Sequence, residues 1–409
     1  MAWAVPVRWF KHAGSALYFA AYIVINAQFA IAITISEASI PERIYLDHAA
    51  TTPIRPEALA AMQQGFAIWA NPSSPHAEGR KAKQALEDAR ERVKKALGWD
   101  GEVIFTSGAS EALWIALNRA KVDRRIVSAV EHDAVFRAAP DAEVVPIGDG
   151  ACVDQDQLND MLARAGRSIV AVQHVNSETG VRQPVSSLAQ KVTEAGSLLI
   201  SDCSQSAGKY TLPDADMIVL SAHKLGGPIG IGALLVSDYN LLEPTGGHER
   251  GYRQGTENLP AVLGFVSALE ARAISKKTVG TGVDTSAIAG QADWVTVAGL
   301  TFVDIEHSIN SANGQFQPPN SDWIEHDYSI LAISHPTMSA QAQLIRLDAM
   351  GFAVSAGSAC SSGTLKKSRV LDAFGVSDEV AARTIRVSMG WNSTYDEMQQ
   401  FAEAWRSLS

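Results

Sequence analysis

Short apolar runs alternate with longer segments of mixed polarity through the first two thirds of the chain. Each run is three to five residues long, which suits a strand, and the segments between them can form helices. One such segment, Ala77 to Leu97, has apolar residues at helical spacing. This alternation is typical of a mostly parallel sheet with helices on both faces, so the sequence predicts an α/β fold with seven strands. The seven runs are 103–105, 126–130, 144–147, 169–172, 198–200, 217–220 and 233–236.

The pattern is different at the amino terminus. Residues 13–36 contain no charged residue and are long enough to span a bilayer, and Arg8 and Lys11 precede them. Asn26 and Gln28 interrupt the apolar run. We therefore expect either an extra helix or a start codon assigned too far upstream. A membrane anchor stays an alternative.

Composition narrows the class of protein. The chain has 409 residues, of which 46% are hydrophobic and 19% charged, as in a globular enzyme. Its net charge of −10 argues against nonspecific binding of nucleic acid. The three cysteines, Cys152, Cys203 and Cys360, are widely spaced, which offers neither a metal site nor a disulfide framework. A reducing, cytoplasmic setting is the simplest interpretation.

A lysine and an aspartate follow two neighbouring apolar runs. Lys224 lies in a glycine-rich turn after 217–220, where burial favours the neutral amine that attacks a carbonyl to form an imine. Asp202 ends the run 198–200. Ligands bind at the carboxyl ends of such strands, and this pair suggests pyridoxal phosphate (PLP). The lysine would hold the aldehyde and the acid would keep the pyridine nitrogen protonated. A surface lysine is the alternative for the turn taken alone.

Two further strand ends carry candidate cofactor contacts. Gly108, Ala109 and Ser110 open a helix, where backbone amides, the hydroxyl and the helix dipole suit a phosphate, although Ser110 could be a simple helix cap. His132 follows 126–130, where an imidazole could stack on a flat cofactor and relay protons, or be merely structural.

Polar groups at two more positions suit the ring of such a cofactor. Asn176 and Ser177 follow an apolar run, and Gln205 lies three residues past Asp202. Each can bind the phenolic oxygen or the imine side of the ring, and a polar loop without a ligand is the alternative. The glycine-rich segment 246–258 suits contact with a phosphate, or is a solvated loop.

Two residues in the last part of the chain carry other chemistry. Cys360 stands among small, flexible residues, which suits an exposed and nucleophilic thiol. Arg386 lies in a strand-like run, where its guanidinium needs an anionic partner. That partner is either a substrate carboxylate or the acid of a structural ion pair.

Four motifs together resemble the cysteine desulfurases of the class V aminotransferase group, which are fold-type I PLP-dependent enzymes. They are Tyr-Leu-Asp-His-Ala-Ala-Thr-Thr-Pro at 45–53, Ser-Ala-His-Lys at 221–224, His-Glu-Arg-Gly at 248–251 and Gly-Ser-Ala-Cys-Ser-Ser at 357–362. The cysteine motif resembles the longer-loop, iron–sulfur-assembly branch. The resemblance covers about 44–273 and 338–407, and 274–328 has no counterpart.

The resemblance implies a two-domain organisation. Residues 59–273 would form the large PLP-binding domain with the mostly parallel seven-stranded sheet. Residues 44–58 and 274–409 would form a smaller α+β domain that carries the cysteine loop, and 1–43 would be an apolar extension.

It also implies a role for each matching residue. Lys224 would be the Schiff-base lysine, Asp202 would pair with the pyridine nitrogen, and Arg386 would bind the substrate carboxylate. Cys360 would attack the sulfur of bound cysteine, leaving alanine and an enzyme persulfide. Around the cofactor ring, His132 would stack on its face, and Gln205, Asn176 and Ser177 would contact its edge, with Asn176 also near the substrate. The phosphate would be bound by Gly108, Ala109, Ser110, Ser221 and His223. Thr256 of a second subunit would complete the phosphate site.

The sequence thus predicts a homodimeric, cytoplasmic cysteine desulfurase that supplies sulfur to an acceptor such as an iron–sulfur scaffold. A selenocysteine lyase or another PLP lyase of this fold is one alternative, and a non-catalytic sulfur-transfer scaffold is another. Cys360 favours the desulfurase, and an intact Lys224 argues against the scaffold. Two positions depart from the family pattern, since Ser177 replaces the usual asparagine and Ser110 the usual threonine.

Overall fold

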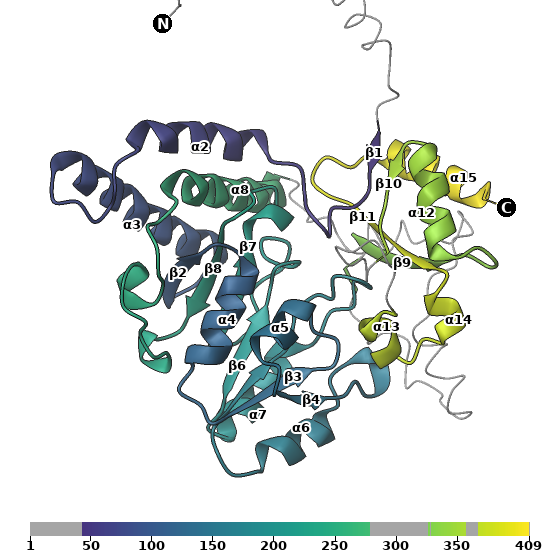
Figure 1. Ribbon diagram of the computed structural model, residues 1–409, viewed down its shortest axis with the longest axis horizontal. Coiled ribbons are helices and arrows are strands. Elements are labelled where there is room, and N and C mark those ends of the chain that lie inside the picture. The colour runs from purple at the N-terminus through teal and green to yellow at the C-terminus, as the bar shows by residue number, and fades with distance from the viewer. Residues whose placement is uncertain (1–42, 279–325, 328, 357–366, 409) are drawn as a thin grey trace, which may run out of the picture. The chain divides into compact units, whose positions relative to one another are not determined.

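The computed structural model describes residues 43–278, 326–327, 329–356 and 367–408 (Figure 1). Of two compact units, Met1–Ile44 and Tyr45–Ser409, the second contains nearly all of the described residues. The apolar segment 13–36 and Cys360 lie outside them. In the described part, no helix combines the length and apolar character needed to cross a membrane.

A seven-stranded sheet forms the larger part of the second unit, in the order β2-β8-β7-β6-β5-β3-β4. Strand β8 runs antiparallel to its neighbours β2 and β7, whereas the other pairs are parallel. The prediction of a mostly parallel sheet of seven strands is therefore confirmed. The strands are β2 (Glu102–Thr106), β3 (Arg124–Ser128), β4 (Glu143–Val145), β5 (Ser168–Ala171), β6 (Leu198–Asp202), β7 (Met217–Ser221) and β8 (Gly232–Val236).

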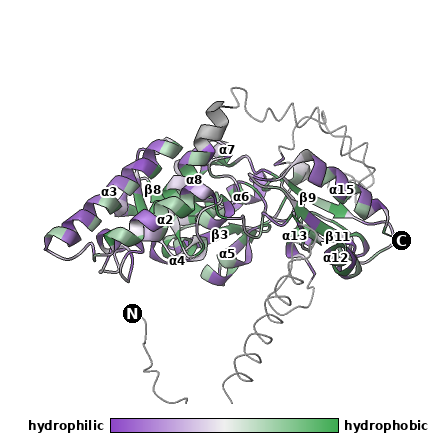
Figure 2. Ribbon diagram, turned by 90° about the horizontal axis from the view of Figure 1, so that it is seen from above, coloured by the Kyte–Doolittle hydropathy of each residue, from purple (hydrophilic) through white to green (hydrophobic). Residues whose placement is uncertain are grey.

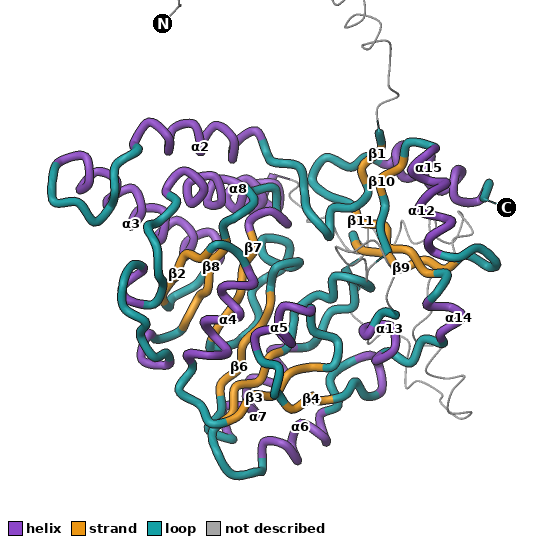
Figure 3. The backbone as a smooth tube through the Cα atoms, in the orientation of Figure 1, coloured by secondary structure: helices purple, strands orange, loops and turns teal. Residues whose placement is uncertain are grey.

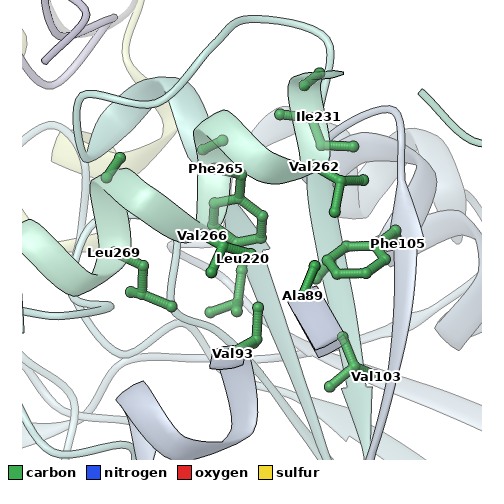
Figure 4. Packing of buried hydrophobic residues seen from close by; sticks show 14 of the residues in the cluster. Ala89, Val93, Val103, Phe105, Leu220, Ile231, Val262, Phe265, Val266 and Leu269 are labelled. Carbon is green, nitrogen blue, oxygen red and sulfur yellow. The ribbon is translucent and has the colours of Figure 1, made fainter. Parts of the chain in front are cut away.

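Helices cover both faces of this sheet because its strands are apolar on both sides. In β7, Ile218 joins the core beneath α3 and α8, as does Leu220 (Figure 4), and Met217 and Val219 join the core beneath α4 and α5. Helix α3 buries a mostly apolar face, which includes Arg90, and turns most of its charged residues to solvent (Figure 2). The helices are α2 (Pro56–Ile68), α3 (Ala77–Leu97), α4 (Ala109–Arg119), α5 (Asp133–Ala138), α6 (Gln155–Leu162), α7 (Val185–Glu194) and α8 (Leu259–Thr278).

The later strands pair among themselves and with β1, separately from the seven-stranded sheet (Figure 3). β9 (Ile330–Ser334) pairs antiparallel with β11 (Thr384–Ser388), and β1 (Ile44–Tyr45) pairs with β10 (Phe352–Ala353). This arrangement agrees with a smaller α+β part, although the domain limits stay a prediction. The accompanying helices are α12 (Ala340–Ala349), α13 (Arg369–Ala373), α14 (Asp378–Ala381) and α15 (Tyr395–Arg406).

Residues 46–55 connect the smaller part to the turn that follows β7. The Ala49 amide donates to Ser388 Oγ in β11 at 2.9 Å. The Thr52 amide donates to the carbonyl of His223 at 2.8 Å, and Thr52 Oγ1 lies 3.4 Å from the carbonyl of Lys224. This segment therefore fixes the lysine turn from the side of the smaller part.

Candidate active site

The carboxyl ends of the parallel strands bring the predicted residues to one edge of the sheet. Asp202 is the last residue of β6, and Lys224 ends the 3-10 turn η2 (Ala222–Lys224) directly after the neighbouring strand β7. His132 follows β3 at the same edge. The charges of Lys224 and Asp202 each shift the pKa of His132, so the three side chains share one electrostatic environment.

The surroundings of Lys224 favour its neutral form. Desolvation lowers the pKa of the Lys224 amine, the positive charges of Arg386 and Lys209 lower it further, and Asp202 opposes the shift. The turn is tight because the Gly227 amide donates to the Ala222 carbonyl at 2.9 Å. A lysine held in this way is an activated amine nucleophile.

Backbone contacts orient Asp202. Its Oδ1 accepts a hydrogen bond from the Ser204 amide at 2.8 Å, and its carbonyl accepts from the His174 amide at 3.0 Å. Gln205 lies just behind it, 6% exposed, and donates from Nε2 to the Ala49 carbonyl at 2.9 Å. The acid is therefore fixed at the strand end, where it can pair with a protonated ring nitrogen.

His132 caps the short helix α5 and has a defined tautomer. Its Nδ1 accepts a hydrogen bond from the Ala134 amide at 3.2 Å, so the proton of the neutral ring is on Nε2. Desolvation and the charge of Lys224 lower the pKa of this imidazole, partly against Asp202 and Asp133. The ring is thus neutral at pH 7 and can stack on a flat group while Nε2–H donates.

The start of α4 suits a phosphate. Gly108 is the N-cap residue and Ser110 lies inside the first turn, so the interpretation of Ser110 as the helix cap is wrong. The first amides of a helix have no intrahelical acceptor, and the dipole there favours an anion. The backbone of β8 approaches closely, because a Cβ added to Gly232 would lie 2.8 Å from Gly108 Cα.

The other predicted phosphate contacts differ in exposure. Ser221 is buried at the end of β7, and His223 Nδ1 lies 3.1 Å from Thr51 Oγ1. Desolvation and Lys224 lower the pKa of His223 to about 4, so its ring is neutral at pH 7. Thr256 is exposed in the loop before α8, as contact with a second subunit requires. The binding roles of these residues stay predictions.

Asn176 holds two loops together in this structure. Its Oδ1 accepts from the Glu178 and Thr179 amides at 2.9 Å, and its Nδ2 donates to the Val130 carbonyl at 3.1 Å. Gly180 closes the same turn with φ +81°, and a Cβ there would lie 2.4 Å from the Ile330 carbonyl oxygen. Glycine is therefore required at this turn, and contact of Asn176 with cofactor or substrate stays a prediction.

Arg386 already has an anionic partner in the protein. Its Nη2 lies 2.7 Å from Asp47 Oδ1 and 2.8 Å from Ser355 Oγ, and its Nη1 donates to the Ser177 carbonyl at 2.9 Å. The buried Nε has no hydrogen-bond partner among the described residues. Sequence reasoning missed the role of Asp47, although it lies inside the motif at 45–53.

A cavity of about 320 Å³ lies beside Arg386. Glu178, Ser368 and Thr384 line it together with Ala356, the last described residue before the cysteine loop. Ser368 Oγ donates to Glu178 Oε2 at 2.6 Å across this cavity wall. Its position places space for a small molecule next to the carboxylate-binding candidate.

These groups fit PLP. They combine an activated lysine, an oriented acid one strand away, a neutral imidazole and open helix amides suited to a phosphate. Each corresponds to one part of that cofactor: the aldehyde, the pyridine nitrogen, the ring face and the phosphate. Cys360 lies outside the described residues, and its predicted role is not tested by the geometry.

The same assignment agrees with comparisons to known proteins. The aminotransferase class-V family model matches residues 44–279. The chain is 30% identical over 381 residues to cysteine desulfurase IscS 1 of Archaeoglobus fulgidus, covering 88% of this chain and 95% of that one. It is 33% identical over 390 residues to a cysteine desulfurase of Cereibacter sphaeroides, covering 88% and 94%. A NifS-like protein from Rickettsia africae has a TM-score of 0.71 at 26% identity, covering 89% and 99%.

Proposed function

The chain belongs to the aminotransferase class-V family and, within it, to the PLP-dependent cysteine desulfurases; on this premise we propose which of its residues carry the reaction. Lys224 holds the cofactor and Cys360 takes the sulfur of L-cysteine. The observation that carries this assignment is the placement of Lys224 and Asp202 at the carboxyl ends of the neighbouring strands β7 and β6.

The cofactor, when bound, supplies an electron sink for chemistry at the substrate Cα and Cβ. Asp202 would keep the ring nitrogen protonated, and His132 would cover the ring with its Nε2–H. The amides of Ala109 and Ser110, with the Ser110 hydroxyl, would hold the phosphate at the helix N-terminus. Lys224, whose amine pKa is lowered by desolvation, would hold the aldehyde and would move protons to and from the substrate carbon.

Arg386 orients the substrate. Its partners Asp47, Ser355 and the Ser177 carbonyl fix the guanidinium plane, and the Nε–H, which is buried without a partner among the described residues, would become a donor to the substrate carboxylate when the side chain moves. The ordinary Arg–carboxylate fork would use two donors, so substrate binding also involves a shift of one of these contacts. Arg386 thus sets the position of the substrate sulfur relative to the loop that carries Cys360.

The sulfur transfer needs no added oxidant or reductant. The Cys360 thiolate attacks the substrate sulfur, an S–S bond forms and the C–S bond breaks. The two electrons of the broken C–S bond remain with the substrate carbon, which takes a proton and leaves as L-alanine. The enzyme keeps a persulfide on Cys360, which passes the terminal sulfur to an acceptor thiol.

We further propose a homodimer. Helix α2 exposes Leu59 and Phe66 (64%) two turns apart on one face, and its C-cap residue Trp69 is 78% exposed. Large exposed apolar groups of this kind mark interaction surfaces. Thr256, exposed in the loop before α8, would complete the phosphate site of the second subunit.

The partner that accepts the sulfur would be a protein thiol, such as that of an iron–sulfur scaffold. The relatives named IscS and NifS-like support this class of acceptor. Such exchange requires a reducing compartment, which supports a cytoplasmic location.

Purified protein loaded with PLP tests the proposal directly. With L-cysteine and a thiol reductant, alanine and sulfide should form in equal amounts, and light scattering should give the mass of a dimer. Release of alanine from L-selenocysteine but not from L-cysteine would contradict the desulfurase in favour of the lyase. A protein that is monomeric and still retains its PLP on dialysis would contradict the shared phosphate site.

A further inference from the structure

Helix α13 begins nine residues after Cys360 and packs against the turn that carries His132. Its apolar residues Val370, Leu371 and Phe374 share one buried cluster with Val130, the second residue before His132. The turn between β3 and α5 is therefore covered by a helix from outside the seven-stranded sheet. Helix α13, which follows Cys360 in the chain, therefore lies against the turn that carries His132.

Arg369 makes the polar part of the same contact. Its Nη2 lies 2.6 Å from Asp133 Oδ1 and 3.3 Å from the carbonyl oxygen of Glu131. Its guanidinium carbon lies 3.7 Å from the centre of the Phe136 ring in α5. One side chain thus contacts the residues on both sides of His132 and the helix that His132 caps.

The inner side of the turn is held by different groups. Gln173 Nε2 and Asn176 Nδ2 both donate to the Val130 carbonyl, the latter at 3.1 Å. Glu131 Oε1 accepts from the Gln173 amide at 2.8 Å. These contacts fix the turn against the loop after β5, and among the described contacts Arg369 closes it from the outer side.

We propose that Arg369 is a positioning residue for His132. It holds the turn from Glu131 to Asp133 so that the exposed imidazole, with its proton on Nε2, faces the cofactor site. This inference rests on the proposed role of His132 in the desulfurase and adds to it a residue that touches neither cofactor nor substrate.

The contact is well suited to a positioning role because it contributes little to stability. The side chains of Arg369 and Asp133 are 43% and 58% exposed, and ion pairs of that exposure contribute little to the free energy of folding. Arg369→Gln should therefore fold. A displacement of a catalytic group by about 1 Å, in contrast, can lower a rate by as much as ~10²-fold.

The test compares Arg369→Gln with Arg92→Gln in the full-length, PLP-loaded protein. Arg92 is a matched control, because it is 41% exposed and pairs with Glu270 between α3 and α8, away from the site. Histidine labelled with ¹³C at Cε1 gives one NMR signal for each of the ten histidines, and His132→Gln assigns the relevant one. The visible circular dichroism of bound PLP and the steady-state kinetics are measured in parallel.

Arg369→Gln should shift the His132 signal, change the circular dichroism of the cofactor and lower kcat by about tenfold, with KM for L-cysteine nearly unchanged. Arg369→Lys should recover part of kcat, since an ammonium can pair with Asp133 but cannot span all three contacts. Asp133→Asn should move the same signal, and the double variant should be no worse than Arg369→Gln.

A His132 signal and a kcat in Arg369→Gln equal to those in Arg92→Gln would overturn the proposal. If Arg369→Gln accumulates poorly, Asp133→Asn tests the same prediction. The NMR signal reads the position of His132 even in a protein that turns over no cysteine. Failure of the desulfurase assignment is therefore distinguishable from failure of this inference.

Discussion

Glu131 offers a sharp test of the electrostatics beneath the cofactor site. Its carboxyl is 1% exposed, and desolvation together with the charge of Asp202 raises its pKa well above the ordinary value of 4.5. The Gln173 amide opposes this shift by donating to Oε1 at 2.8 Å. Oε2 is buried without a hydrogen-bond partner among the described residues, and this burial favours the protonated carboxyl over the carboxylate.

The sign of the pH effect follows from which state, folded or unfolded, loses the Glu131 proton at the lower pH. Above pH 4.5 the unfolded chain loses the Glu131 proton while the folded chain retains it, which stabilises the unfolded state. The stability linked to this group is complete below pH 4.5 and declines as the pH rises toward the raised pKa. One proton corresponds to about 1.4 kcal/mol for each pH unit in that window.

Glu131→Gln replaces the protonated carboxyl with a neutral group of the same shape that can still accept from Gln173. The free energy of unfolding of the variant minus that of the wild type should therefore rise as the pH increases above 4.5, by at most about 1.4 kcal/mol per pH unit, and should level off above the raised pKa of Glu131. Urea denaturation of both proteins at several pH values between 5 and 7 measures this slope. Glu91→Gln, at an exposed site on α3, controls for the removal of one carboxylate.

A difference between Glu131→Gln and the wild type that does not change with pH would refute the reasoning. It would mean that Glu131 is ionised in the folded protein, with a cation or water as its partner. The same result in Glu91→Gln as in Glu131→Gln would show that the slope comes from net charge rather than from burial.

Three further outcomes follow from the site and its supports. Glu249→Gln should lower the free energy of unfolding by about 1.5–3 kcal/mol in urea denaturation, because it removes the 2.6 Å charged contact of buried Arg90 and leaves Glu87, 3.5 Å away, as its acidic partner. An unchanged denaturation midpoint would contradict this. Arg386→Lys should raise KM for L-cysteine by about 10–100-fold, since a charged hydrogen bond is worth about 1.5–3 kcal/mol, and steady-state assays would refute this if kcat alone changed. Lys224→Ala should lose the bound cofactor's visible absorbance on dialysis, and retention of that band would contradict its role.

The sheet was predictable because its strands are short apolar runs and β2, β3, β4 and β5 are each followed by an α-helix. Period and composition do not report strand direction, so the antiparallel β8 could not be distinguished from its parallel neighbours. The run 233–236 would look the same in either direction. The polar residues at strand ends were predictable for a related reason, since loops after parallel strands meet at one edge.

Long-range partners were not predictable from spacing. Arg386 needed an anion, and the sequence left a substrate carboxylate and a structural acid as alternatives. In the structure the anionic partner of Arg386 is Asp47, 339 positions away in the chain. The Nε of Arg386 has no hydrogen-bond partner among the described residues. The tautomer of His132 likewise depends on the Ala134 amide, a contact that only the backbone conformation of the α5 N-terminus reveals.

The central claim is that Lys224 and Asp202 bind the cofactor while Cys360 removes the sulfur. The most direct measurement is the mass of the Cys360-containing peptide after the PLP-loaded protein meets L-cysteine without reductant, with alanine measured in the same sample. We predict a gain of one sulfur atom on Cys360 and one alanine per site, and neither in Cys360→Ala. The buried thiol of Cys203, whose pKa is raised to about 12, should stay unmodified in both proteins. Undiminished alanine formation by Cys360→Ala would contradict the account.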